Sequence, residues 1–136
     1  MARSGKTQRS RGFTLIELMI VISVILILVS IAIPAYNQSI LRAKEGVLRQ
    51  NLFTLRSLIS QYTLDKQKAP QALDDLVSGG YLKQIPIDPF TGRNDTWTTE
   101  AEDVTLSIDQ TGDPGITDVH SGSEQVSTDG TAYNTW

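Results

Sequence analysis

Few side chains in this sequence have the types and spacing that chemistry requires. The chain contains no cysteine and a single histidine, His120. A covalent catalyst needs a nucleophile beside a base, and no serine and acidic residue accompany His120 in a recognisable catalytic motif. We therefore predict that the protein is not an enzyme and that His120 is a surface or strand-edge residue rather than a ligand.

Acidic and hydroxyl side chains gather near the C-terminus. The carboxylates are those of Asp109, Asp113, Asp118, Glu124 and Asp129, and Ser121, Ser123 and Ser127 lie between them. Oxygen ligands on loops that can bend around a cation suit calcium. The sequence leaves two hypotheses open, a calcium site and a solvated acidic loop without metal.

Another acid, Glu17, follows Phe13, Leu15 and Ile16 in a strongly apolar stretch. An ionised carboxylate is costly in hydrocarbon unless a positive group pairs with it. A free N-terminal amine would be such a group. The alternative is that the carboxylate reaches the lipid headgroups from the end of its helix.

The element that positions Glu17 is an apolar segment. Residues 18–33 are interrupted only by Ser23 and Ser30, and as a helix they would cover about 24 Å. Residues 13–16 bring this length near the ~30 Å of a bilayer core. A plain signal anchor is one alternative. A buried core helix of a soluble protein is another, but the remaining chain is too small to wrap it.

A basic leader precedes the apolar segment. Its charged residues are Arg3, Lys6, Arg9 and Arg11, and it contains no acid. Positive flanks stay in the cytoplasm, so the far end of the helix should face outward. A secretory leader has its cleavage site after the apolar core, whereas the only small-residue junction here, Gly12, comes before it. Cleavage at Gly12 would leave the apolar segment on the mature protein.

The charge of the chain is segregated. Residues 13–136 hold 8 basic and 15 acidic side chains, a net charge of about −7. Because a negatively charged protein is not attracted to phosphate backbones, nucleic acid is not expected as a primary partner.

After Pro34 the pattern becomes amphipathic. Apolar residues recur at helical spacing: Leu41, Leu48, Leu52, Leu55, Ile59 and Tyr62. The residues between them are predicted to form a solvated face: Arg42, Lys44, Glu45, Arg49, Gln50, Arg56 and Ser60. We predict one helix over residues 13–66, roughly 80 Å long, ended by the polar residues and proline of residues 65–70. Pro34 predicts a kink or local break, or marks the exit from the bilayer.

The remaining chain predicts a small head. We expect a short helix over residues 71–78, a loop over 80–92 in which Asp88 caps a turn, and a hairpin of strands at 96–99 and 104–108 joined by a turn at 100–103. A third strand is expected at 116–120. The fold class is α+β: a long N-terminal helix, hydrophobic in one half and amphipathic in the other, with a small C-terminal antiparallel β-sheet head.

Two motifs resemble a known family. Residues 9–18, Arg-Ser-Arg-Gly-Phe-Thr-Leu-Ile-Glu-Leu, resemble the leader of type IV prepilins and type II secretion pseudopilins. Residues 80–92, Gly-Tyr-Leu-Lys-Gln-Ile-Pro-Ile-Asp-Pro-Phe-Thr-Gly, follow a leucine-rich short helix and closely resemble the loop of the major, or G-type, pseudopilin. The second motif separates the subfamilies.

The resemblance implies a division of the chain into five parts. Residues 1–12 are a cleaved prepilin leader, 13–35 a hydrophobic transmembrane and assembly helix, and 36–66 an amphipathic helix packing on the head. Residues 67–95 form the short helix and connecting loop, and 96–136 the small β-sheet and acidic C-terminal loop.

The resemblance also implies functional residues. A prepilin peptidase would cut after Gly12 and methylate the new N-terminal Phe13. Glu17 would pair with Phe13 of a neighbouring copy or with the assembly platform, and Pro34 would accompany helix changes in the filament. A calcium ion would be bound in the C-terminal loop, and the matching positions are Asp118, Ser121 and Asp129.

The implied function is that of a filament subunit of type II protein secretion, which polymerises to drive the export of folded proteins. Its partners would be other copies, prepilin peptidase, minor pseudopilins, the inner-membrane assembly platform and, before assembly, membrane lipid. It would cross the inner membrane once, with its head in the periplasm. Two alternatives remain: a type IV pilin forming surface fibres for adhesion, motility or DNA uptake, and a monomeric membrane-anchored binding module.

Overall fold

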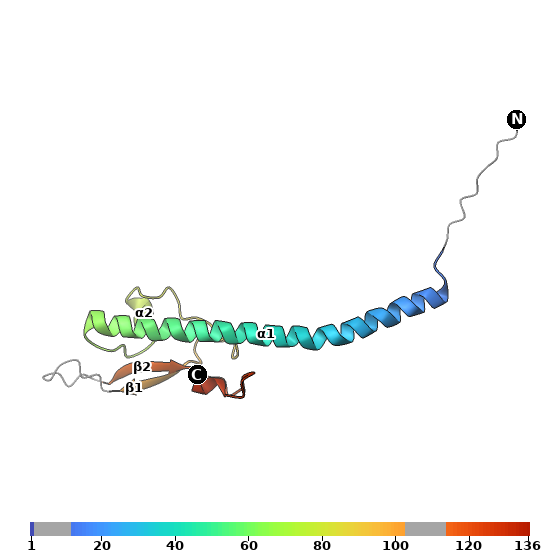
Figure 1. The fold of residues 1–136 in the computed structure, drawn as a ribbon. Coiled ribbons are helices and arrows are strands. Elements are labelled where there is room, and N and C mark those ends of the chain that lie inside the picture. The colour runs from blue at the N-terminus through green and yellow to red at the C-terminus, as the bar shows by residue number, and fades with distance from the viewer. Residues whose placement is uncertain (2–11, 103–113) are drawn as a thin grey trace. The chain divides into compact units, whose positions relative to one another are not determined.

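The computed structural model describes residues 1, 12–102 and 114–136. In chain order the elements are helix α1 (Leu15–Lys66), helix α2 (Asp74–Ser78), strand β1 (Thr98–Glu102), strand β2 (Gly115–His120) and the short 3-10 helix η1 (Tyr133–Thr135) (Figure 1). The chain divides into two compact units, Met1–Gln38 and the head, Ser39–Trp136. The predicted α+β class is confirmed.

The first unit contains the apolar half of α1. The Thr14 hydroxyl accepts a hydrogen bond from the Glu17 amide at 3.3 Å, which caps the first turn. The hydroxyls of Ser23 and Ser30 donate to main-chain oxygens one turn earlier, at 2.8 and 2.7 Å. Both hydroxyls are therefore satisfied on their own helix, as polar groups in an apolar environment must be. Within the described residues, α1 is the one helix long and apolar enough to cross a membrane.

Helix α1 continues through Pro34, so the local break predicted there is not formed. A proline inside a helix removes one hydrogen bond, and the turns on either side hold the helical conformation. The C-terminal end agrees with the prediction, since α1 ends at Lys66. Gln67 follows with a φ of 54°, the left-handed conformation in which helices commonly stop.

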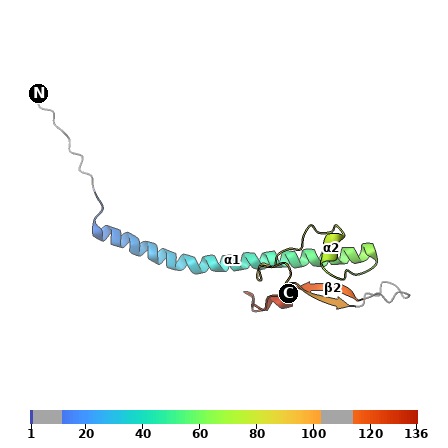
Figure 2. The ribbon, with the colours of Figure 1, turned by 180° about the vertical axis from the view of Figure 1, so that it is seen from behind.

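One face of the second half of α1 forms one side of the hydrophobic core of the head. Its buried apolar residues are Leu48, Leu52, Leu55 and Ile59. They are four of the six residues that were predicted to form the apolar face of this helix. They pack with Leu73, Leu76, Trp97, Ile116, Val119 and Tyr133 from the rest of the head. Figures 1 and 2 show the sheet lying along one side of this half of α1. Each large side chain buried here contributes about 1.5–3 kcal/mol.

Among the described residues, the sheet has two antiparallel strands. Strand β1 pairs with β2 from Thr98↔His120 to Glu102↔Gly115, with an irregularity between Glu100 and Ala101. The strand predicted at 116–120 is confirmed, but the turn predicted at 100–103 is wrong, because residues 100–102 belong to β1. Pairing with β2 outweighs the weak strand preference of alanine and glutamate. The strand predicted at 104–108 lies outside the described residues.

Helix α2 is shorter than the predicted 71–78. The carboxylate of Asp75 accepts hydrogen bonds from the amides of Gln71 and Ala72, at 2.7 and 3.1 Å, which holds the residues before Asp74 in a turn. At the other end Gly80 has a φ of 80° and the Tyr81 amide donates to the Leu76 oxygen, so a glycine ends the helix.

Candidate functional sites

The Gly12–Phe13 bond precedes α1 in an open, non-helical segment. Phe13 is 84% exposed, and a Cβ atom placed on Gly12 would meet nothing within 4 Å. The packing of the chain therefore does not require glycine at this position. The bond is accessible to an enzyme, and a substitution of Gly12 would test recognition without disturbing the fold.

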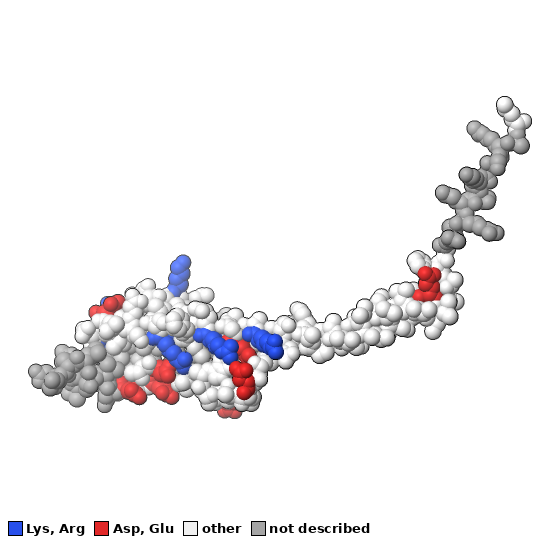
Figure 3. Space-filling model, in the orientation of Figure 1, with Lys and Arg blue, Asp and Glu red and all other residues white. Residues whose placement is uncertain are grey.

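Glu17 lies in the first turn of α1 and is exposed. Within the described part of the chain, its carboxylate has no hydrogen-bond or ion-pair partner. On the face drawn in Figure 3, this half of α1 is uncharged except for an acidic patch near its N-terminal end. The helix dipole favours a negative charge here. The carboxylate is therefore free to accept a positive partner from outside the chain.

Pro34 is also exposed and lies about 25 Å from Glu17 along the axis of α1. The structure therefore does not bring the two predicted assembly residues together into one site.

The head contains a buried carboxylate, that of Glu45, which was predicted to lie on the solvated face of the helix. Glu45 is only 2% exposed. Its carboxylate accepts hydrogen bonds from the Thr128 amide at 2.8 Å, the Thr128 hydroxyl at 2.7 Å and the Tyr133 hydroxyl at 2.8 Å. It thus joins α1 to the C-terminal segment.

These hydrogen bonds set the protonation of the cluster. Burial alone would raise the pKa of Glu45, but the bonds from Thr128 and Tyr133 and the charge of Arg49 outweigh it and hold the pKa below its usual value. Burial, together with the hydrogen bond to Glu45, raises the pKa of Tyr133 to about 12. Glu45 is therefore ionised and Tyr133 neutral at pH 7.

A second buried carboxylate, Asp88, anchors the loop that carried the subfamily motif. It is fully buried; one oxygen accepts the Phe90 amide at 2.9 Å and the other accepts the Ser121 hydroxyl at 2.5 Å. The predicted turn-capping role of Asp88 is confirmed. Ser121, predicted as a calcium ligand, is engaged in tying this loop to the end of β2.

The other two predicted calcium ligands are paired with arginines. Asp118 contacts Arg56 at 2.6 Å and Asp129 contacts Arg49 at 3.3 Å. Asp118, Ser121 and Asp129 each serve a different contact, and a calcium ion bound by all three would have to displace both arginines. Asp109 and Asp113 lie outside the described residues. Calcium binding stays a prediction.

The calcium prediction has a direct test. Binding at Asp118, Ser121 and Asp129 should raise the melting temperature of the detergent-solubilised chain in millimolar calcium relative to chelator, because a ligand bound only by the folded state stabilises it. Asp129→Ala should abolish this rise, and Glu124→Ala, which removes an exposed acid of the same segment, should keep it. Equal melting temperatures in calcium and chelator would discard the site.

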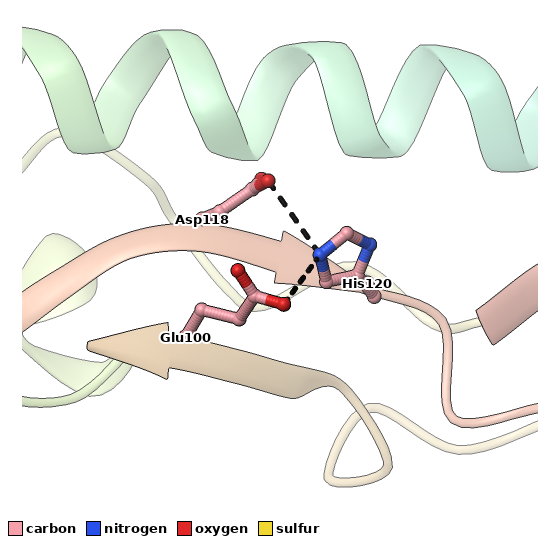
Figure 4. Close-up of side chains that lie close together, drawn as sticks. All are labelled: Glu100, Asp118 and His120. Atoms are coloured by element: carbon pink, nitrogen blue, oxygen red, sulfur yellow. Dashed lines mark ion pairs between the residues drawn. The ribbon is translucent and has the colours of Figure 1, made fainter. Parts of the chain in front are cut away.

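A different cluster joins the two strands. His120 Nε2 lies 3.3 Å from a Glu100 oxygen and 3.5 Å from Asp118 Oδ2 (Figure 4). His120 Nδ1 lies 2.5 Å from the main-chain oxygen of Trp136. Burial would raise the pKa of Asp118, but the Val119 amide and Arg56 outweigh this and hold the pKa below its usual value. Two carboxylate oxygens therefore face one imidazole nitrogen.

Comparison with known proteins identifies the family. A family model described as the prokaryotic N-terminal methylation motif matches residues 7–33. The type II secretion system core protein G of Klebsiella pneumoniae is 32% identical over 99 residues, which cover 61% of this chain and 71% of that protein. The chain belongs to the family of type II secretion system core protein G.

Other relatives agree with this family assignment. Core protein G of Aeromonas hydrophila is 31% identical, with 61% of this chain and 69% of that protein covered. The type IV major pilin protein PilE of Neisseria gonorrhoeae is 34% identical over 87 residues, but the match covers only 51% of that protein. None of the solved structures matches the chain. The predicted resemblance to G-type pseudopilins is confirmed, and the type IV pilin alternative is less well supported.

Proposed function

We propose that this chain is the major structural subunit of the type II secretion pseudopilus. It is cleaved after Gly12, remains anchored in the inner membrane by α1, and polymerises into a periplasmic filament whose growth pushes folded proteins outward. Its role is mechanical rather than enzymatic. Membership of the core protein G family supports this proposal.

The observation that carries the proposal is the exposed apolar half of α1. The apolar side chains from Leu15 to Ile33 are between 43% and 83% exposed, and this half bears one carboxylate, Glu17. An apolar surface of this size has to be covered. Lipid covers it before assembly, and neighbouring copies cover it in the filament.

In the proposed filament, Phe13 and Glu17 have specific roles. The amine created on Phe13 by cleavage pairs with Glu17 of a neighbour, which sets the axial register of incoming copies. The basic leader keeps the N-terminus in the cytoplasm, so the head faces the periplasm. Minor pseudopilins and the inner-membrane assembly platform are the partners that start and drive polymerisation.

The match to a type IV major pilin supports one alternative, a subunit of surface fibres. Deletion of the gene separates the two functions. Loss of protein export with no loss of surface fibres supports the pseudopilin, and loss of fibres with normal export supports the pilin.

Processing at Gly12 is the first test of the proposal. Co-expression with a prepilin peptidase should yield a chain that begins at N-methylated Phe13, measured by intact mass. Gly12→Leu should leave an uncut, membrane-held precursor, because the peptidase has to accept the residue before the bond. Gly5→Leu, a matched change elsewhere in the leader, should be cut normally. Normal cutting of Gly12→Leu would show that the junction lies elsewhere.

A further inference from the structure

The cluster of Glu100, Asp118 and His120 brings three potential metal ligands together. One oxygen from each carboxylate and one ring nitrogen all lie within 4.8 Å of one another. The three side chains come from neighbouring positions on β1 and β2, since Glu100 pairs with Asp118 and His120 follows on the same face of β2 two residues later. Figure 4 shows the three side chains pointing toward one another.

The tautomer of His120 follows from its other contact. The main-chain oxygen of Trp136 can only accept a hydrogen bond, so His120 Nδ1 carries the proton in that bond. Nε2 then faces the two carboxylate oxygens. Its lone pair would be repelled by them unless a proton or a metal ion stands between.

The distances suit a metal ion between the three side chains. A protonated Nε2 would form a charge-assisted hydrogen bond of about 2.7–2.9 Å, and one N–H can point at only one of the two oxygens. The observed distances are longer, 3.3 and 3.5 Å. Ligands about 2.0–2.1 Å from a tetrahedral zinc ion lie about 3.3–3.4 Å apart. Both distances are close to that edge length.

The surroundings also resemble those of a metal ligand set. Histidines that bind metals typically donate their second nitrogen to a main-chain oxygen or carboxylate, as His120 does to Trp136. Asp118 is held in the same way, because Arg56 Nε and the Val119 amide bind its Oδ1 and leave Oδ2 for the cluster. Only 17% of the His120 side chain is exposed, and Glu100, at 61%, provides the open side.

We propose that Glu100, Asp118 and His120 form a zinc site in which water completes the coordination. One imidazole and two carboxylates suit zinc or a similar divalent transition metal, whereas calcium and magnesium prefer oxygen ligands alone. The ion would clamp β1 to β2. This site is independent of the filament function and differs from the predicted calcium site, with which it shares only Asp118.

The test uses the full chain in detergent, purified without a histidine tag so that His120 is its only imidazole. Cobalt(II) serves as the spectroscopic probe for zinc. We expect one cobalt ion per chain with the visible absorption of tetrahedral coordination, displaced by zinc and not by millimolar calcium. Absence of this absorption, or displacement by calcium, would overturn the proposal.

Glu100→Gln is the decisive variant, because its exposed side chain can change without disturbing the core. It should weaken cobalt and zinc binding at least about tenfold. Glu102→Gln, the matched acid two residues further along β1, should bind like the parent. His120→Gln should abolish the tetrahedral absorption. Parent-like binding by Glu100→Gln, or equal weakening by Glu102→Gln, would mean that the metal is held by surface charge elsewhere.

Discussion

Glu45→Ala is expected to lower the free energy of unfolding of the head by about 3 kcal/mol. The substitution removes three hydrogen bonds to an ionised group. It leaves the hydroxyl of the fully buried Tyr133 without its partner, whereas Thr128 is exposed and its donors can turn to water. Hydrogen bonds to charged groups contribute about 1.5–3 kcal/mol each and are not additive. Both tryptophans, Trp97 and Trp136, lie in the head, so denaturant unfolding followed by tryptophan fluorescence reports this unit alone.

The control is Glu124→Ala, which removes an exposed acid and should change the free energy of unfolding by no more than about 0.5 kcal/mol. Equal stability of the Glu45→Ala variant and the parent would mean that the buried cluster does not hold the C-terminal segment to α1.

The same residue gives the head a defined pH dependence. Because the folded pKa of Glu45 is lowered from 4.5, its contribution is present above that pH and is lost as the pH falls through the folded value. Glu45→Gln should therefore lose less stability than the parent between pH 5 and acid. Asp118, whose pKa is also lowered, should leave part of the acid sensitivity in place.

Glu17→Ala is expected to be processed normally and to fail in filament assembly. In the proposed filament the substitution would leave the amine of a neighbouring Phe13 unpaired in an apolar core, which costs several kcal/mol, whereas an exposed ion pair contributes about 1 kcal/mol or less. A penalty of about 3 kcal/mol per added copy lowers the association constant more than a hundredfold.

Sheared filament yield and electron microscopy measure this effect in cells that carry the assembly system. Glu124→Ala serves as the exposed-acid control and should assemble like the parent. Wild-type filament yield from Glu17→Ala would remove the pairing argument, while normal processing of the same variant would leave the family assignment untouched.

Features that depend on a repeating apolar pattern or on a few neighbouring residues could be predicted from the sequence. The buried residues Leu48, Leu52, Leu55 and Ile59 follow from helical spacing alone, because burial of an apolar face repeats every three to four residues. The end of α1 follows from the polar residues and proline after it. The turn at Asp88 could be predicted because this aspartate lies between two prolines. The hydrogen bond that its side chain accepts comes from the amide of Phe90, only two residues later in the sequence.

Long-range polar contacts could not be predicted in the same way. The partners of Glu45 lie 83 and 88 residues further along the chain. The residues next to Glu45 in the sequence do not indicate these partners. The burial of Glu45 could have been predicted from its spacing. It lies four residues after Leu41 and three before Leu48, which places it on the apolar face of the helix. The pairing of β1 with the strand after residues 103–113, and with it the cluster around His120, likewise depends on register and not on local sequence.

The exposed apolar half of α1 has a consequence for how copies are supplied. A free copy of this chain cannot dissolve in water, because its apolar surface has to stay in lipid. Growth of the proposed filament would therefore draw on a two-dimensional population, and the quantity that decides between growth and shrinkage would be the number of copies per area of membrane. A copy that left the proposed filament would return to the bilayer, where it could be added again.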